Sequence, residues 1–207
     1  MMSSTERKTE ISMALKSISE IRRQELMAAA MKVVEMKGFA GATLEQVAKQ
    51  AGASKGIVLH YFKNKQQLFE HAMRFGNAEL RRTAVKRLRE ARTPHERLWA
   101  VIAVNFEDEF FRPEICQAWL SLCAEVAHND QFRRLQVAIH SRMNSNLVSA
   151  LRQLLPDDEA REYAIALSGL VDGLWLRRAI HPDGLTQDVA INILRESIRE
   201  RVPNFQV

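Results

Sequence analysis

The chain has 207 residues, of which 46% are hydrophobic and 27% charged, and this globular composition excludes a mainly disordered protein. With 8 Gly and 5 Pro, and no apolar run near the about 18 residues of a membrane span, strand-rich and membrane-spanning folds are also disfavoured. The net charge is +5, but residues 1–90 carry 17 basic and 9 acidic side chains against 13 and 16 in residues 91–207, so only the first part suits a polyanion.

Residues 1–17 lack the apolar segment of a signal peptide, and we expect them to form a mobile N-terminal arm. The two cysteines, Cys116 and Cys123, are too few for a disulfide framework or a zinc site, and at a helical spacing of seven they lie too far apart to bridge. We therefore expect reduced thiols in a cytoplasmic protein that binds neither a metal nor another cofactor.

Residues 18–63 carry the signals of a small helical domain. Apolar residues recur at helical spacing from Ile18 to Met36, and Gly38 follows as a helix end. Thr43 with Gln46 reads as a capping box that opens a second, short helix. Gly52 ends that helix, and a third begins after a serine cap and runs to about residue 62. This order predicts a helix-turn-helix at residues 43–62.

Residues 64–207 continue as helices separated by proline and glycine breaks. The apolar stripes and caps predict six further helices, over about 65–90, 94–106, 115–126, 132–155, 157–180 and 187–198. Thr93 and Thr186 are predicted to cap the helices that follow them, and the acidic residues 157–159 put negative charge on the start of another. The fold class is therefore all-α, with about nine helices and no strand. A boundary between a head and a larger helical body is expected near residue 63.

The helix-turn-helix segment combines residues that fix its geometry with residues that suit DNA. Ala48 is small where two helices touch, Gly52 serves the turn, and Val58 and Leu59 are expected to make apolar contacts. Polar or small positions at the helix starts and along the second helix are typical of contacts with phosphates and base edges. The predicted DNA-binding residues are Thr43, Ser54, Lys55, Gly56, His60, Tyr61 and Lys65. The alternative is a capped helical hairpin without a ligand.

The segment from Thr43 to Lys65 resembles the N-terminal signature of the TetR family of bacterial repressors. The resemblance implies a three-helix head that binds double-stranded operator DNA and a six-helix body that binds a small-molecule effector. It also implies a homodimer through the last two helices, whose apolar residues are Leu167, Leu170, Val171, Leu174, Val189, Ile193 and Ile198. The alternative is that these residues fill the core of one protomer.

Within the family, residues 118–120, 145–147 and 170–176 are similar to a member that responds to choline and controls its conversion to glycine betaine. A quaternary ammonium ion is held by aromatic faces and a carboxylate, because it has no proton to donate. The resemblance and this chemistry predict an effector site formed by Phe106, Trp119, Asn146, Tyr163, Asp172 and Trp175, with Phe110 as a further aromatic candidate.

Several alternatives to this site stay open. The two tryptophans suit a core as well as a cage, and Asp172 has Arg177 and Arg178 as nearby partners on its helix. The effector of such a repressor could instead be an apolar drug, a fatty acyl compound or a nucleobase. An enzyme is disfavoured because the chain lacks Gly-x-Ser-x-Gly, P-loop and His-Glu-x-x-His motifs, so no catalytic residue is expected. A protein that packages DNA regardless of sequence is a further alternative.

Overall fold

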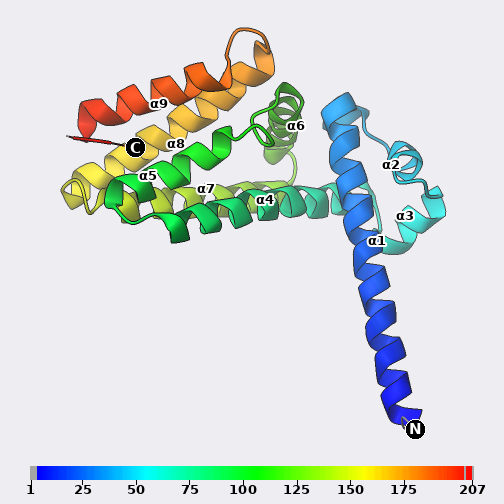
Figure 1. The fold of residues 1–207 in the computed structure, drawn as a ribbon. Coiled ribbons are helices and arrows are strands. Elements are labelled where there is room, and N and C mark those ends of the chain that lie inside the picture. The colour runs from blue at the N-terminus through cyan, green and yellow to red at the C-terminus, as the bar shows by residue number, and fades with distance from the viewer. Residues whose placement is uncertain (1–3, 203, 207) are drawn as a thin grey trace. The chain divides into compact units, whose positions relative to one another are not determined.

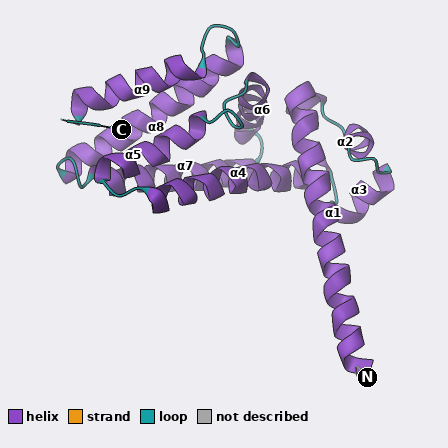
Figure 2. Ribbon diagram, in the orientation of Figure 1, coloured by secondary structure: helices purple, strands orange, loops and turns teal. Residues whose placement is uncertain are grey.

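The computed structural model describes residues 4–202 and 204–206, with side chains from residue 18 onward. Every regular element in that part of the chain is a helix, which confirms the expected all-α fold (Figure 2). The chain divides into two compact units, Met1–Gly76 and Asn77–Val207. A search of the described helices finds none that is long and apolar enough to cross a membrane.

The first unit contains three helices and the start of a fourth (Figure 1), namely α1 (Ser4–Gly41), α2 (Leu44–Gln50), α3 (Lys55–Tyr61) and α4 (Lys65–Glu90). The predicted N-terminal arm lies partly outside the described residues, since these begin at residue 4. From there the backbone is helical and continuous with α1. The mobility of residues 1–17 stays a prediction.

Gly38 ends the regular part of α1, as the sequence predicts. Its φ of 66° and ψ of 171° are open to glycine and strained for other residues. The chain turns there, and the buried ring of Phe39 packs edge-on against Phe69 of α4, with ring centroids 5.4 Å apart. The first turns of α4 therefore belong to the head, and the first unit extends to Gly76.

The second unit contains the rest of α4, five α-helices and two short 3-10 helices. These are α5 (Pro94–Ala103), η1 (Val104–Phe106), α6 (Pro113–Ala124), η2 (Glu125–Ala127), α7 (Asp130–Leu151), α8 (Asp157–Ile180) and α9 (Gln187–Arg201). The caps predicted at Thr93 and Thr186 are present, and Thr93 forms a full capping box with Glu96. Three predicted helices end early, because the chain tightens into η1 after α5 and η2 after α6, and turns at 152–155 after α7.

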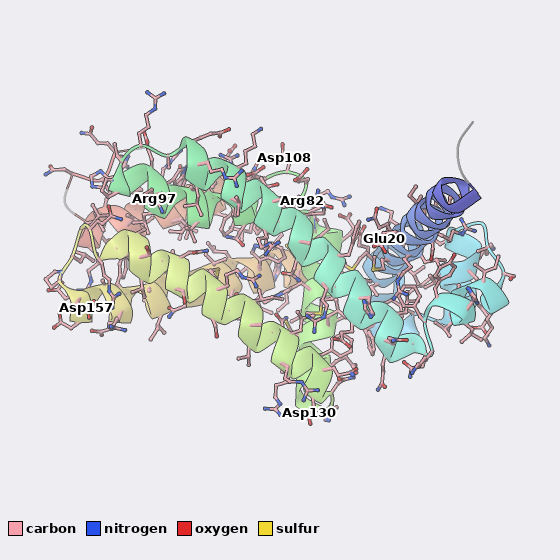
Figure 3. The ribbon with its side chains drawn as sticks, turned by 90° about the horizontal axis from the view of Figure 1, so that it is seen from below. Glu20, Arg82, Arg97, Asp108, Asp130 and Asp157 are labelled. Atoms are coloured by element: carbon pink, nitrogen blue, oxygen red, sulfur yellow. The ribbon has the colours of Figure 1, made fainter. Side chains whose placement is uncertain are left out.

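The core of the second unit is formed by residues of the helices from α5 through α9. Phe106, Leu147, Leu167 and Leu194 have at most 1% of their surface exposed and belong to one apolar cluster. In Figure 3, Asp130 marks the start of α7 and Asp157 the turn into α8. Side chains on both sides of that turn bind the Asp157 carboxylate, and hydrogen bonds from Arg161 and Arg152 hold the pKa of Asp157 below its usual range. The negative charge predicted at this helix start is present.

Candidate DNA-binding surface and effector site

The helix-turn-helix is fixed by two side-chain caps and one glycine. Thr43 Oγ1 accepts the Gln46 N–H at 3.2 Å, and Gln46 Oε1 accepts the Thr43 N–H at 2.9 Å. Gly52 has a φ of 59°, in the left-handed region that favours glycine. Ser54 Oγ accepts the Ile57 N–H at 3.3 Å and caps α3. The sequence predicts this local structure correctly.

One side of α3 packs against the rest of the head, and the other side is exposed to solvent. Val58 is fully buried, as is Phe62 directly after the helix. Leu59 was expected to contact the interior, and that expectation is wrong, because the side chain is 44% exposed. It lies about 100° around the helix from Val58 and so faces solvent. The exposed positions of α3 are Lys55, Gly56, Ile57, Leu59 and His60.

The two predicted lysines have different surroundings. Lys55 Nζ forms an ion pair with Glu45 of α2, and this hydrogen-bonded contact lowers the pKa of the Glu45 carboxyl. Both side chains of the pair are more than half exposed, so the pair is weak and Lys55 can exchange its partner for a phosphate. Lys65 Nζ instead donates to the Ala40 carbonyl at 3.2 Å and lies 4.5 Å from the Phe39 ring centroid. Lys65 therefore joins α4 to the end of α1.

Gly56 is exposed and meets no steric limit within the head. A Cβ atom built there would lie 3.7 Å from Ser54 Oγ, which is ordinary contact. Near the end of the same helix, the rings of His60 and Tyr61 pack edge-on with centroids 5.1 Å apart. His60 is exposed, and Tyr61 is half-buried. The head itself gives no reason for a glycine at the start of α3.

In the second unit, the two predicted tryptophans lie together. The ring centroids of Trp119 on α6 and Trp175 on α8 are 5.7 Å apart, and the ring planes meet at 74°. Trp175 Nε1 donates to the Asn105 carbonyl at 3.1 Å, which fixes the orientation of the indole. Both tryptophans are half-buried. Two aromatic rings therefore meet at nearly a right angle between α6 and α8.

Asp172 lies about one turn before Trp175 on α8, so the two side chains share a face of the helix. Its Oδ2 atom is 3.5 Å from His140 Nδ1 of α7. Burial raises the pKa of the Asp172 carboxyl, and the charge of His140 acts in the opposite direction. Arg178 donates to the carbonyls of Pro182 and Leu185. The partner of Asp172 in the structure is therefore His140.

The other predicted effector residues lie less close to the tryptophan pair and Asp172. Phe106 is buried, and its ring centroid is 4.8 Å from Phe111, which lies 6.4 Å from Trp175. Tyr163 donates its hydroxyl proton to the Ser197 carbonyl at 2.7 Å. Twelve residues separate it from Trp175, or about 18 Å along α8, so Tyr163 joins α8 to α9 and not the tryptophan pair.

On α7, the structure points to different polar residues from the one predicted. Asn146 is half-buried, whereas Asn144 Oδ1 is inaccessible to solvent and has no hydrogen-bond partner. His140, Asn144 and Phe111 are not among the site residues predicted from the sequence. His140 and Asn144 are polar and four residues apart in a helix with apolar stripes, which is the signal that could have found them.

Both cysteines are free thiols, with Cys116 buried and Cys123 half-buried. Burial raises the pKa of Cys116 to about 12 and that of Cys123 to about 11. Cys123 Sγ accepts a hydrogen bond from Gln136 Nε2 at 3.1 Å. Among the residues that the structure describes, no three His, Cys, Asp or Glu side chains gather as a metal site would require.

The predicted dimer residues divide into two groups. Leu167, Val171, Leu174 and Ile198 are at most 5% exposed, and Leu170 packs against the same core, so these residues fill the core of the protomer. The other two predicted residues, Val189 and Ile193, are exposed, and further exposed apolar residues lie on α8. The exposed set is Ile165 at 67%, Leu176 at 39% and Ile180 at 61% on α8, with Val189 at 47% and Ile193 at 40% on α9.

Comparison with known proteins identifies the family. Residues 26–72 match the family model of bacterial regulatory proteins of the tetR family, and residues 94–203 match the C-terminal model of BetI-type transcriptional repressors. The chain is 36% identical to the HTH-type transcriptional regulator BetI of Klebsiella pneumoniae (strain 342) over 89% of this chain and 95% of the relative.

Solved structures agree with this assignment. A transcriptional regulator from Pseudomonas aeruginosa PAO1 is 26% identical, with a TM-score of 0.76 over 87% of this chain and 90% of that one. A regulator from Saccharomonospora viridis, solved in complex with choline, is 21% identical and has the same fold, with a TM-score of 0.80 over 89% of this chain and 98% of that one. The chain therefore belongs to the TetR family of bacterial regulatory proteins, and its residues 94–203 form the C-terminal domain of a BetI-type transcriptional repressor.

Proposed function

We propose that the protein is a homodimeric repressor of genes for choline uptake and glycine betaine synthesis, and that choline weakens its hold on operator DNA. The observation that carries the proposal is the pair of tryptophan rings, Trp119 and Trp175, whose planes meet at 74°, with the Asp172 carboxylate about one turn away on α8. A trimethylammonium group is attracted by aromatic faces and by a negative charge, and this arrangement offers both. Relatives named BetI and a regulator solved with choline support the same effector.

The recognition element in this proposal is α3, docked in the major groove. Its exposed side carries Lys55 and His60, which suit base acceptors or phosphates, and also Ile57 and Leu59. Exposed apolar side chains on a recognition helix suit the methyl groups of thymine. Thr43, Ser54 and Tyr61 lie at helix ends, where contacts with phosphates position a head on the duplex. Because operator DNA of a bacterium lies in the cytoplasm, the proposed repressor acts there.

The proposed dimer interface is a stripe on α8 together with the exposed apolar residues of α9. Ile165, Gly169, Gly173, Leu176 and Ile180 follow one another at intervals of three or four residues, so they share one side of α8. A Cβ atom added at either glycine would meet nothing within 4 Å. Small residues between exposed apolar ones allow a second helix to approach closely. Two such pairs of helices form a four-helix bundle about a two-fold axis.

A chain of contacts within the second unit joins the tryptophan pair to α4. Trp175 binds the Asn105 carbonyl, and Gln187 Nε2 donates to the neighbouring Phe106 carbonyl at 2.5 Å, so η1 is held from two sides. The next residue, Glu107, forms an ion pair with Arg87 of α4. Since α4 is one helix from Lys65 to Glu90, a change at η1 reaches a helix that begins in the head. We propose this as the route by which the effector acts on DNA binding.

The proposal is tested first by binding to each ligand separately. We expect the protein to bind DNA from upstream of its own gene far more tightly than random duplex, because specific sites gain about 4–10 kcal/mol over non-specific ones. We expect choline to bind the DNA-free protein in a calorimetric titration. Equal affinity for both duplexes would favour a packaging protein, and an absence of choline binding beside specific DNA binding would favour a TetR-type repressor with another effector.

A further inference from the structure

A layer of polar side chains lies between α7 and α8, and part of it has no partner. The two helices are joined by only five residues, 152–156, and run antiparallel. His140 on α7 meets Asp172 on α8 at 3.5 Å. In an antiparallel pair, one turn forward on α7 corresponds to one turn back on α8. Asn144 therefore lies level with Ser168, one turn from the His140–Asp172 contact.

The partnerless atoms belong to this second pair. Asn144 Oδ1 and Ser168 Oγ are both inaccessible to solvent and lack a hydrogen bond. Polar side chains around them do have partners, since Gln136 donates to Cys123 and Asp172 meets His140. A buried acceptor without a donor is costly, and such atoms are normally satisfied in the functional state. A hydroxyl group would match the pair chemically, because it can donate to Asn144 Oδ1 and accept from Ser168 Oγ.

We infer that Asn144 and Ser168 bind the hydroxyl group of the effector. This inference rests on the proposal that choline binds at Trp119, Trp175 and Asp172. Along α8 the order is Ser168, Asp172, Trp175, with about one turn between neighbours. A cation held by the tryptophans and Asp172 directs its two-carbon arm either toward Ser168 or away from it. Only the first direction places a donor at Asn144 Oδ1 and an acceptor for the Ser168 hydroxyl proton.

This arrangement predicts selectivity between choline and related cations. Glycine betaine carries a carboxylate where choline has its hydroxyl, so it brings no proton for Asn144 Oδ1 and adds a negative charge near Asp172. Propyltrimethylammonium has a methyl group there and leaves both polar atoms without a partner. A site that hydrogen-bonds a hydroxyl rejects an analogue that lacks it more strongly than an apolar pocket does.

The test is calorimetric titration of the full-length protein with choline, propyltrimethylammonium and glycine betaine. We expect choline to bind about tenfold or more tightly than propyltrimethylammonium, since an unpaired buried polar group carries a cost of that order. In Ser168→Ala and in Asn144→Leu this preference should shrink, and in the double variant it should fall to about threefold or less, because only there does the analogue leave neither polar atom unpaired. Ser145→Ala is the matched control, as Ser145 is exposed and binds the Ser141 carbonyl of its own helix.

The outcomes separate the two proposals. If neither cation binds the wild-type protein, the choline assignment fails and the hydroxyl site fails with it. If both cations bind the wild-type protein equally well, the ammonium site stands and the role of Asn144 and Ser168 is overturned. A preference for choline that survives in both variants also overturns it. The wild-type comparison needs no variant, so the test does not depend on how well the altered proteins fold.

Discussion

Gly52 and Gly56 lie four residues apart in the head, and glycine occurs at the two positions for different physical reasons. Gly52 has a φ of 59°, so a side chain there is strained in the folded head itself. Gly56 has ordinary helical geometry and room for a Cβ atom. A glycine inside a helix costs about 1 kcal/mol relative to alanine, and the free head gains nothing visible in return. We attribute Gly56 to the close approach of the DNA backbone.

This contrast predicts different effects of the same substitution. Gly56→Ala should leave the thermal stability of the protein unchanged or slightly raised, and should weaken operator binding by about tenfold or more, since a methyl group displaces the backbone. Gly52→Ala should lower stability by about 1–2 kcal/mol. Thermal unfolding and fluorescence anisotropy measure the two effects. Full operator affinity in Gly56→Ala would show that α3 does not approach DNA at this position.

Asp172 gives the effector site a predictable response to pH. Burial raises the pKa of its carboxyl, so the negative charge is lost at a higher pH than for an exposed aspartate. Choline binding should weaken as the pH falls through that raised pKa, because the protonated carboxyl no longer attracts a cation. His140 faces Asp172 from α7, with Nδ1 3.5 Å from Oδ2. Cys123, with a pKa of about 11, stays neutral.

Titrations of choline from neutral to acid pH measure this response. In Asp172→Asn we expect binding about tenfold weaker at neutral pH, as one ion contact is worth about 1.4 kcal/mol, with much less dependence on pH. His140→Gln serves as the control for the histidine. Unchanged choline affinity in Asp172→Asn would remove this carboxylate from the proposed site.

At the scale of elements, the sequence predicts the starts of helices better than their ends. Thr43, Ser54, Thr93 and Thr186 all cap helices as predicted, because a cap depends on residues three positions apart. The early ends of the predicted helices at Ala103, Ala124 and Leu151 carry no comparable local signal. They depend on packing with distant segments, such as the bond from Trp175 to the Asn105 carbonyl.

The contacts within the candidate site could likewise be predicted only in part, because some of them depend on packing with distant segments. The pairing of Trp119 with Trp175 was found because both are large aromatic residues in similar apolar segments. The partner of Asp172 could not be found from its own helix, because it is His140 on α7. Tyr163 shares α8 with Trp175 but binds α9, which only the three-dimensional packing reveals.

The contact between Glu107 and Arg87 predicts variants that bind both ligands but no longer couple them. In Glu107→Gln, affinities for choline alone and for operator alone should each stay within about threefold of wild type. The weakening of operator binding by choline, typically worth about 1–3 kcal/mol in coupled systems, should be largely lost. Anisotropy titrations with and without choline measure it. Glu79→Gln is the matched control, because Glu79 pairs with Arg82 within α4 (both in the second unit, with Arg82 labelled in Figure 3). Coupling at the wild-type level in Glu107→Gln would rule out this route.

At the scale of the whole molecule, the burial pattern revises the predicted dimer surface. A helical stripe in a sequence does not tell whether it faces its own core or a partner, and five of the seven predicted residues pack in the core of the protomer. Ile165, Leu176 and Ile180 are exposed on α8, as are Val189 and Ile193 on α9. Each large apolar side chain removed from water contributes about 1.5–3 kcal/mol, so these residues suit a stable two-fold interface.

Charged residues on this stripe should separate the protomers. Ile165→Glu combined with Ile180→Glu should yield particles with the mass of one chain, where the wild-type protein has the mass of two, as measured by light scattering. Operator affinity should fall by at least about a hundredfold, because one head contacts only one half-site. Val137→Glu on α7 is the control, since Val137 is also exposed, at 60%. A double variant that keeps the mass of two chains would place the interface elsewhere.

The proposed function requires one protein to bind an operator and to release it in response to choline. The most direct measurement is a titration of choline into the protein bound to fluorescent DNA from its own promoter, with glycine betaine and an equal concentration of sodium chloride as controls. We expect a saturable loss of anisotropy with choline that neither control reproduces. Tight, sequence-specific binding that choline leaves unchanged would contradict the choline-responsive repressor described here.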